Sequence, residues 1–282
     1  MKLGICCVYF FRPDSEWLLD LQLRYIRETL EGYDYTVYAG AIRLRPELRP
    51  RLEREERLEI VSLPHFEGID NAEHAFYLDA LLRHAAKDGC THLAALDCDS
   101  FPVCGDWPRI LRSRMEGKRL AAVHRTENLD TFLPHPCGLF MERSFLLDHD
   151  PKMLPPREAI ADFLAATRQR FDTGIGYGHA LWKSGESWLS LERTNRKNVH
   201  YLMAGIYGDT FFHVGASSRP SIHFYAEDLK SPHHKLNSIP VLWRCGSWLH
   251  KRESNRNIRL LARISDALKK NPDRFLSSLR NY

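Results

Sequence analysis

Apolar residues in the first hundred positions alternate between the spacing of buried strands and the spacing of helices that bury one face. Short apolar runs predict strands, at residues 2–10, 35–40, 58–64 and 91–97. Between them, residues 14–32 and 68–89 carry apolar side chains at helical spacing, with Asp14 expected to cap the first helix and Asp70 with Glu73 to open the second. This alternation predicts an α/β fold, a mostly parallel sheet with helices on both faces.

The pattern continues less regularly after Gly105. Further strands and helices are expected, the strands at 120–127, 137–145 and 209–215 and the helices at 157–170 and 174–185. No internal repeat or low-complexity segment interrupts them. The chain of 282 residues is therefore expected to fold as one large α/β domain with elaborations.

Charge is concentrated at the C-terminus, where residues 250–282 carry nine Lys and Arg against three Asp and Glu, while the whole chain has a formal charge of +4. The body is thus slightly acidic, so we do not expect it to bind nucleic acid. The seven cysteines form no CxxC pair, a usage that favours a reducing cytoplasm. No signal peptide or membrane span is expected, because no apolar run approaches about 18 residues.

The stretch HLAALDCDSFP, residues 92–102, ends a buried-looking strand on two carboxylates. In extended chain, Asp97 and Asp99 point to the same side, at the carboxyl end of a strand where ligands of such sheets bind. Two like charges this close favour a cation between them, and a hard divalent ion with phosphate oxygens suits carboxylates. The alternative is a pair of ordinary acidic residues that open a surface loop.

Four segments, in this order, resemble the GT-A glycosyltransferases, in particular the family-two-like members. They are NAEHAFYLDALLRHAAKDGCTHLAALDCDSFPV, PCGLFMERSFL, FDTGIGYGHALWKSG and FFHVGASSR, within roughly residues 1–220. The resemblance implies that Asp97 and Asp99 form the DxD motif that holds Mn²⁺ or Mg²⁺ against the diphosphate of a nucleotide sugar. It also implies that His213 is a third metal ligand and that Asp172 is the general base of an inverting transfer. Phe171 stands where relatives commonly have Glu.

Other candidate residues follow from their places in the chain. Tyr9 and Arg12 end the first strand, where Tyr9 would stack on the base and Arg12 would pair with phosphate. Asn71 opens a helix and would contact the nucleotide or cap the helix, and Arg219 would reach the diphosphate from a small-residue loop. The structural alternatives are a core aromatic for Tyr9, a surface arginine for Arg12, and a helix N-cap for Asp172.

The resemblance implies a catalytic domain at 1–225, with a nucleotide-binding half at 1–104 and an acceptor-binding half at 105–225. A basic helical extension at 226–282 follows, and it is expected to make peripheral membrane contact at most. The implied activity is transfer of a sugar from a nucleoside diphosphate sugar, with a UDP-sugar as the expected donor. The acceptor is the hydroxyl of a saccharide or other molecule in the cytoplasm. The alternatives are a non-catalytic nucleotide-sugar- or carbohydrate-binding protein of the same fold, and a nucleotidyltransferase. A dehydrogenase is disfavoured because no GxGxxG follows the first strand.

Overall fold

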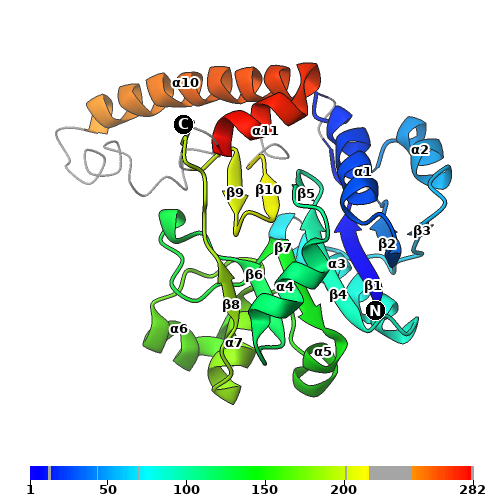
Figure 1. Ribbon diagram of the computed structural model, residues 1–282. Helices are drawn as coiled ribbons and strands as arrows, with labels where there is room; N and C mark the ends of the chain where they lie inside the picture. The colour runs from blue at the N-terminus through cyan, green and yellow to red at the C-terminus, as the bar shows by residue number, and fades with distance from the viewer. Residues whose placement is uncertain (12–13, 43, 69, 201, 216–242, 281–282) are drawn as a thin grey trace.

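The computed structural model describes residues 1–11, 14–42, 44–68, 70–200, 202–215 and 243–280 (Figure 1). Its centre is a seven-stranded sheet in the order β3-β2-β1-β4-β7-β6-β8. The strands are β1 (Lys2–Val8), β2 (Asp34–Gly40), β3 (Leu58–Ile60), β4 (His92–Asp97), β6 (Leu120–Val123), β7 (His135–Glu142) and β8 (Leu189–Leu191). All neighbours pair in parallel except those of β7, which runs opposite to β4 and β6. The predicted fold class, a mostly parallel α/β sheet, is confirmed.

Helices cover both faces of this sheet. They are α1 (Trp17–Thr29), α2 (Arg49–Glu53), α3 (Asp70–Lys87), α4 (Trp107–Met115), α5 (Arg143–His149), α6 (Ala161–Thr167), α7 (Ile175–Ser184), α10 (Trp243–Lys270) and α11 (Pro272–Arg280), with 3₁₀ turns η1 (Pro46–Leu48), η2 (Thr126–Asn128) and η3 (Arg157–Ile160). Successive side chains of β4 point to opposite faces of the sheet. Leu93 and Ala95 pack with α3, α5 and α7 on one face, whereas Ala94 and Leu96 pack with α1 and α4 on the other. Its uniformly apolar sequence is explained because both of its faces are covered.

A second, three-stranded antiparallel sheet in the order β5-β10-β9 stands at the carboxyl end of β4. It consists of β5 (Ser100–Pro102), β9 (Gly205–Tyr207) and β10 (Phe211–His213). The register of β10 against β5 sets His213 opposite Ser100, and the amide of Val214 donates to the carbonyl of Asp99 at 3.0 Å. A late segment of the chain is thereby held against the residues that follow β4.

The C-terminal helices α10 and α11 lie over β9 and β10 at one end of the molecule (Figure 1). Ile264 and Leu268 of α10, with Leu276 and Leu279 of α11, are buried in the cluster that contains Tyr9 and parts of α1 and β10. Among the described residues, no helix is long and apolar enough to span a membrane.

Several local predictions need correction. The first helix begins at Trp17 with Glu16 at its N-cap, so Asp14 does not cap it, although Gly32 does follow its end with φ +80°. On α10, Ile264 and Leu268 are buried together with Ser254 and Asn257, whereas Ile258 is 40% exposed. Helix α4 and strands β5, β8 and β9 were not predicted.

Candidate functional site

The two carboxylates of the DCD stretch and the imidazole of His213 converge where β4 ends. Asp97 is the last residue of β4, and the chain turns at Cys98 and Asp99 before β5, so the extended geometry expected for this stretch is wrong. The two carboxylates nevertheless lie close together. The pairing of β10 with β5 brings His213 alongside them. Nε2 of His213 lies 3.3 Å from Oδ1 of Asp99 and 3.8 Å from Oδ2 of Asp97.

A buried glutamine on α1 fixes the turn that carries these carboxylates. Nε2 of Gln22 donates to the carbonyls of Asp97 at 2.8 Å and Ser100 at 2.6 Å, and the Ser100 hydroxyl also donates to the Asp97 carbonyl. Gln22 and Ser100 are fully buried. The backbone under the two carboxylates is therefore held by hydrogen bonds from inside the core.

The electrostatics of the three side chains are those of crowded, buried ionisable groups. Burial raises the pKa of Asp97, and Asp99 raises it further, while His74, His213 and Arg125 favour its ionised form. Burial alone would lower the pKa of His213, but Cys137 and Asp99 more than offset that and raise it well above its usual value. Positive charge around the carboxylates comes from His213 and Arg125.

One ligand atom of this group lacks a hydrogen bond. Oδ1 of Asp97 is buried without a hydrogen-bond partner, and its nearest ionic neighbour is Nε2 of His74 at 3.7 Å. The ligand atoms of Asp97, Asp99 and His213 all lie within 4.8 Å of one another. Two carboxylate oxygens and one imidazole nitrogen are ligands that a divalent cation such as Mn²⁺ accepts.

A second group of ligand-type side chains shares Asp97. Atoms of Asp97, His135 and Cys137 also lie within 4.8 Å of one another. His135 and Cys137 come from β7, where both are buried, and the ring of His135 lies 6.1 Å from that of His213. Sequence analysis did not assign a role to either residue.

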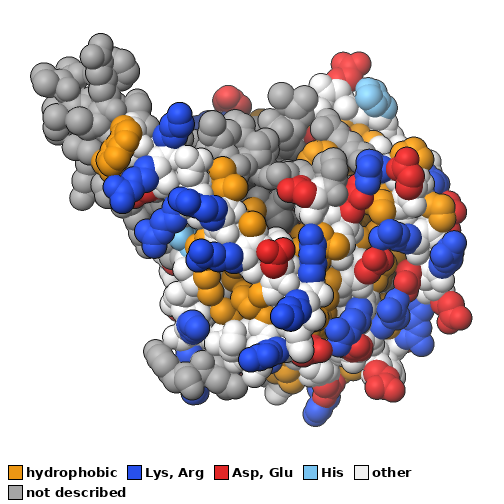
Figure 2. All heavy atoms as spheres, turned by 90° about the horizontal axis from the view of Figure 1, so that it is seen from above, with side chains coloured by type: hydrophobic (Ala, Val, Ile, Leu, Met, Phe, Trp, Pro, Cys, Tyr) orange, Lys and Arg blue, Asp and Glu red, His pale blue; other side chains and the backbone are white. Residues whose placement is uncertain are grey.

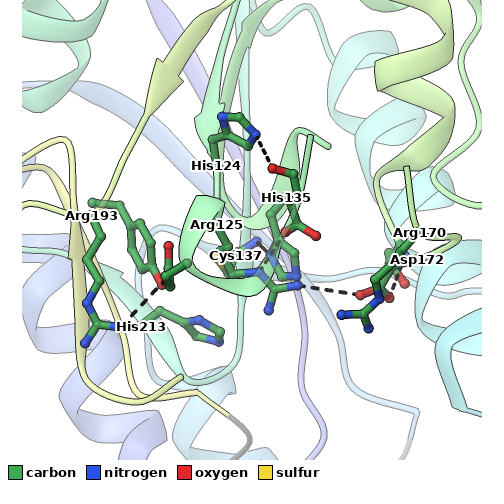
Figure 3. Close-up of polar contacts among 12 residues, drawn as sticks. His124, Arg125, His135, Cys137, Arg170, Asp172, Arg193 and His213 are labelled. Carbon is green, nitrogen blue, oxygen red and sulfur yellow. Dashed lines mark hydrogen bonds and ion pairs between the residues drawn. The ribbon is translucent and has the colours of Figure 1, made fainter. Parts of the chain in front are cut away.

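The candidate base Asp172 lies beside a buried arginine. Nη2 of Arg125 is 3.5 Å from Oδ2 of Asp172, and Nε of Arg125 is 3.4 Å from Oδ2 of Asp130. Oδ1 of Asp172 accepts hydrogen bonds from the Thr173 amide at 2.8 Å and from Nδ2 of Asn71 at 3.1 Å. In Figure 3, Arg125 lies between His213 and Asp172, and a dashed line joins it to Asp172.

The alternative role of Asp172 as a helix N-cap is wrong. Helix α7 begins at Ile175, and Gly174, with φ +100°, occupies the cap without a side-chain hydrogen bond. A Cβ at Gly174 would meet the carbonyl oxygen of Pro134 at 2.2 Å, which explains glycine there. Asp172 therefore precedes the helix, and its carboxylate is directed toward Arg125 and Asn71.

The remaining predicted residues are placed as follows. Asn71 lies on the first turn of α3 and donates a hydrogen bond to Asp172. A residue predicted to contact the nucleotide therefore lies beside the candidate base. Tyr9 is fully buried, with its ring 5.9 Å from that of Phe11, so the structure puts it in the core and not on a surface where a base could stack. Arg12 and Arg219 lie outside the described residues.

The topology explains why sequence reasoning missed Arg125, His135 and Cys137. Strand β6 runs parallel to β4, so Arg125, just after β6, reaches the same sheet edge as Asp97; the rule that ligands bind at carboxyl strand ends would have found it. His135 and Cys137 reach this edge because β7 is reversed and begins there. No local pattern in the sequence predicts that β7 runs antiparallel to its neighbours.

Comparisons with known proteins give distant structural similarities. No protein-family model and no curated protein matches the chain. Residues 1–349 of S. aureus TarS, solved with UDP, are 11% identical over 56% of this chain and 51% of that one, with TM-score 0.38. The mannosyltransferase PcManGT of Pyrobaculum calidifontis, solved with GDP-Man and Mn²⁺, is 14% identical over 67% and 54%, with TM-score 0.40. A cytidylyltransferase of Leptospira borgpetersenii is 12% identical over 73% and 81%, with TM-score 0.43. The chain spans about half the length of the first two.

Proposed function

We propose that the chain is a metal-dependent glycosyltransferase that moves a sugar from a nucleoside diphosphate sugar to an acceptor hydroxyl. The observation that carries this proposal is the convergence of Asp97, Asp99 and His213 within 4.8 Å at the carboxyl end of β4. Ligands of open α/β sheets bind at this edge. A UDP-sugar is the first donor to test, and a saccharide hydroxyl the first acceptor.

The ligand set suits a hard divalent cation. Mn²⁺ or Mg²⁺ held by Asp97, Asp99 and His213 would neutralise the charge that grows on a departing diphosphate. Support comes from Oδ1 of Asp97, a carboxylate oxygen that is buried without a hydrogen-bond partner.

Asp172 is the residue proposed to accept the proton of the attacking hydroxyl. Its Oδ1 is held by the Thr173 amide and by Asn71, and its Oδ2 lies beside Arg125. These contacts orient the carboxylate, and general-base help of this kind is worth on the order of 10² to 10⁴ in rate. A base on the face opposite the leaving group would give inversion at the anomeric carbon.

Arg125 is proposed to separate the two carboxylate regions electrostatically. Its guanidinium is close enough to favour the ionised form of Asp97 and also pairs with Asp130 and Asp172. One buried cation thus serves both ends of the site. We propose that its ion pair with Asp172 holds the base in place, apart from the metal ligands.

The test is calorimetric binding of UDP with and without Mn²⁺. Wild type should bind UDP tightly only with the ion, and Asp97→Asn and Asp99→Asn should each lose that dependence while keeping the fold. Asp106→Asn is a matched control, because Asp106 is a surface carboxylate at the start of α4 that pairs with Arg109. Undiminished Mn²⁺-dependent binding in both site variants would refute the metal assignment.

A second assay separates the transferase from its alternatives. Incubation with UDP-sugar, Mn²⁺ and an acceptor panel should release UDP, which identifies sugar transfer. Release of pyrophosphate from nucleoside triphosphate and sugar phosphate would instead identify a nucleotidyltransferase. Tight donor binding with no release of either product would identify a binding protein of this fold.

A further inference from the structure

The residues His135 and Cys137 face the end of β4 because of how two strands pair. Strands β4 and β7 are antiparallel, with Ala95 opposite Leu139, so β7 begins where β4 ends. The register of β7 against β6 shifts between Ala122 and Val123, so the first residues of β7, which include His135 and Cys137, depart from regular pairing. This brings a thiol, an imidazole and a carboxylate together within 4.8 Å.

Both strand side chains are secluded from solvent. Cys137 is fully buried and His135 is 7% exposed, whereas the Asp97 side chain is 19% exposed and opens toward the site. The Cys137 amide donates a 3.2 Å hydrogen bond to Nδ1 of His135, so an Nδ1 lone pair is directed toward the backbone of residue 137. A metal bound through Nδ1 would take the place of this hydrogen bond.

The chemistry of this group differs from that of Asp97, Asp99 and His213. Sulfur, nitrogen and one carboxylate oxygen are the donors that zinc prefers, whereas Mn²⁺ and Mg²⁺ prefer oxygen. Within the described residues, this is the cysteine-containing group whose ligand atoms come this close. Oδ1 of the shared Asp97 is buried without a hydrogen-bond partner.

We propose that Asp97, His135 and Cys137 form a binding site for a thiolate-preferring divalent cation, zinc, which shares Asp97 with the Asp97–Asp99–His213 group and differs from it in the other two ligands. On binding, the Cys137 thiol gives up its proton to solvent and forms a sulfur–metal bond. Because Asp97 belongs to both groups, an ion at this site draws on a carboxylate that the other group also uses. Zinc should therefore weaken Mn²⁺-dependent UDP binding.

The test uses Co²⁺ as a spectroscopic substitute for zinc in the full chain after treatment with a chelator. Wild type should develop a thiolate-to-cobalt charge-transfer absorption in the near ultraviolet that saturates and is abolished by added Zn²⁺. Cys137→Ser should lose the band. Asp99→Asn, which leaves all three ligands in place, and Cys104→Ser, whose cysteine lies outside the group, should both keep it.

A second variant covers the case in which Cys137→Ser fails to fold. His135→Gln keeps the thiol, so it should still give a charge-transfer band but with at least about tenfold weaker Zn²⁺ affinity in competition with a chelating dye. No band in wild type, or a full band in folded Cys137→Ser, would overturn the proposal. The readout is the absorption of the metal itself, so the outcome does not depend on sugar transfer.

Discussion

Replacing Arg125 by Met is the sharpest test of how the site is held together. The change removes a cation whose side chain is 17% exposed and leaves two carboxylates, Asp130 and Asp172, whose side chains are 2% and 19% exposed. Methionine has a similar length and fills much of the same space. The effect should therefore come from lost charge rather than from a cavity.

The expected loss of stability follows from the burial of these groups. Breaking a buried ion pair by removing one partner costs about 3–5 kcal/mol, and we take about 3 kcal/mol because Asp172 is partly exposed. For a chain of this size that corresponds to a fall in melting temperature of about 6 °C or more. By contrast, Arg109→Met removes an exposed pair with Asp106 and should leave the melting temperature close to that of wild type.

The loss should depend on pH with a defined sign. Burial raises the pKa of Asp130 and Arg125 lowers it, so removing Arg125 raises the folded-state pKa further. A carboxyl whose folded pKa exceeds its unfolded pKa destabilises the fold increasingly as pH rises between those two values. The deficit of Arg125→Met should be complete above the folded pKa of Asp130 and smaller in acid.

Thermal unfolding followed by circular dichroism at about pH 7.5 and about pH 5 measures both effects. Adding Asp130→Asn to Arg125→Met should recover stability, because one unpaired buried carboxylate is then removed. A variant as stable as wild type at neutral pH would refute the reasoning. So would a deficit that grows in acid.

Three further outcomes are expected. Asp172→Asn should keep UDP affinity, because the amide oxygen of asparagine still accepts the hydrogen bond from Thr173. Its transfer rate should fall about 10²- to 10⁴-fold, because an amide cannot accept the proton. Near-normal turnover would show that Asp172 is not the base. In metal-free protein, Asp97→Asn should be as stable as wild type or more so at neutral pH, because burial raises the pKa of Asp97; marked destabilisation on thermal melting would contradict this. At physiological salt the protein should stay in the supernatant with anionic liposomes; pelleting abolished by serine at 252, 259 and 263 would instead show membrane binding.

The last expectation rests on the packing of α10. Figure 2 shows Lys and Arg side chains gathered on part of the molecular surface. Arg252, Arg259 and Arg263 of α10 are exposed. Its apolar residues Ile264 and Leu268 are instead buried against the body of the protein. The helix therefore presents charge to solvent without a broad apolar face to insert into lipid.

Local patterns predicted most of the parallel sheet because its strands are covered on both faces. The run HLAAL before Asp97 is apolar for that reason, and the helical spacing before it marks α3 with equal clarity. The same reasoning placed Asp97 and Asp99 at the ligand-binding edge. Strands β5, β8 and β9 have three residues each, too few to show a period, and were missed. Strands β3 and β10 are equally short and were found from the longer segments 58–64 and 209–215.

The parts of the site that sequence could not supply depend on contacts between distant segments. His213 was predicted from a resemblance, but its position next to Asp99 depends on the pairing of β10 with β5. Cys137 belongs to the site only because β7 is reversed. Tyr9 was expected near the base, yet it is buried under α1 and the C-terminal helices, a tertiary packing that a strand-end pattern does not encode.

Because the last helix packs against the first, folding of this part of the protein cannot be completed until the whole chain has been synthesised. Tyr25 of α1 donates a hydrogen bond to Asp273, 248 residues later, and Leu276 and Leu279 close the same cluster as Tyr9. Chains are synthesised at about 5–20 residues per second, so at the slower rates α11 follows α1 by tens of seconds. During that interval one flank of the nascent sheet is apolar and uncovered, a surface suited to capture by a chaperone.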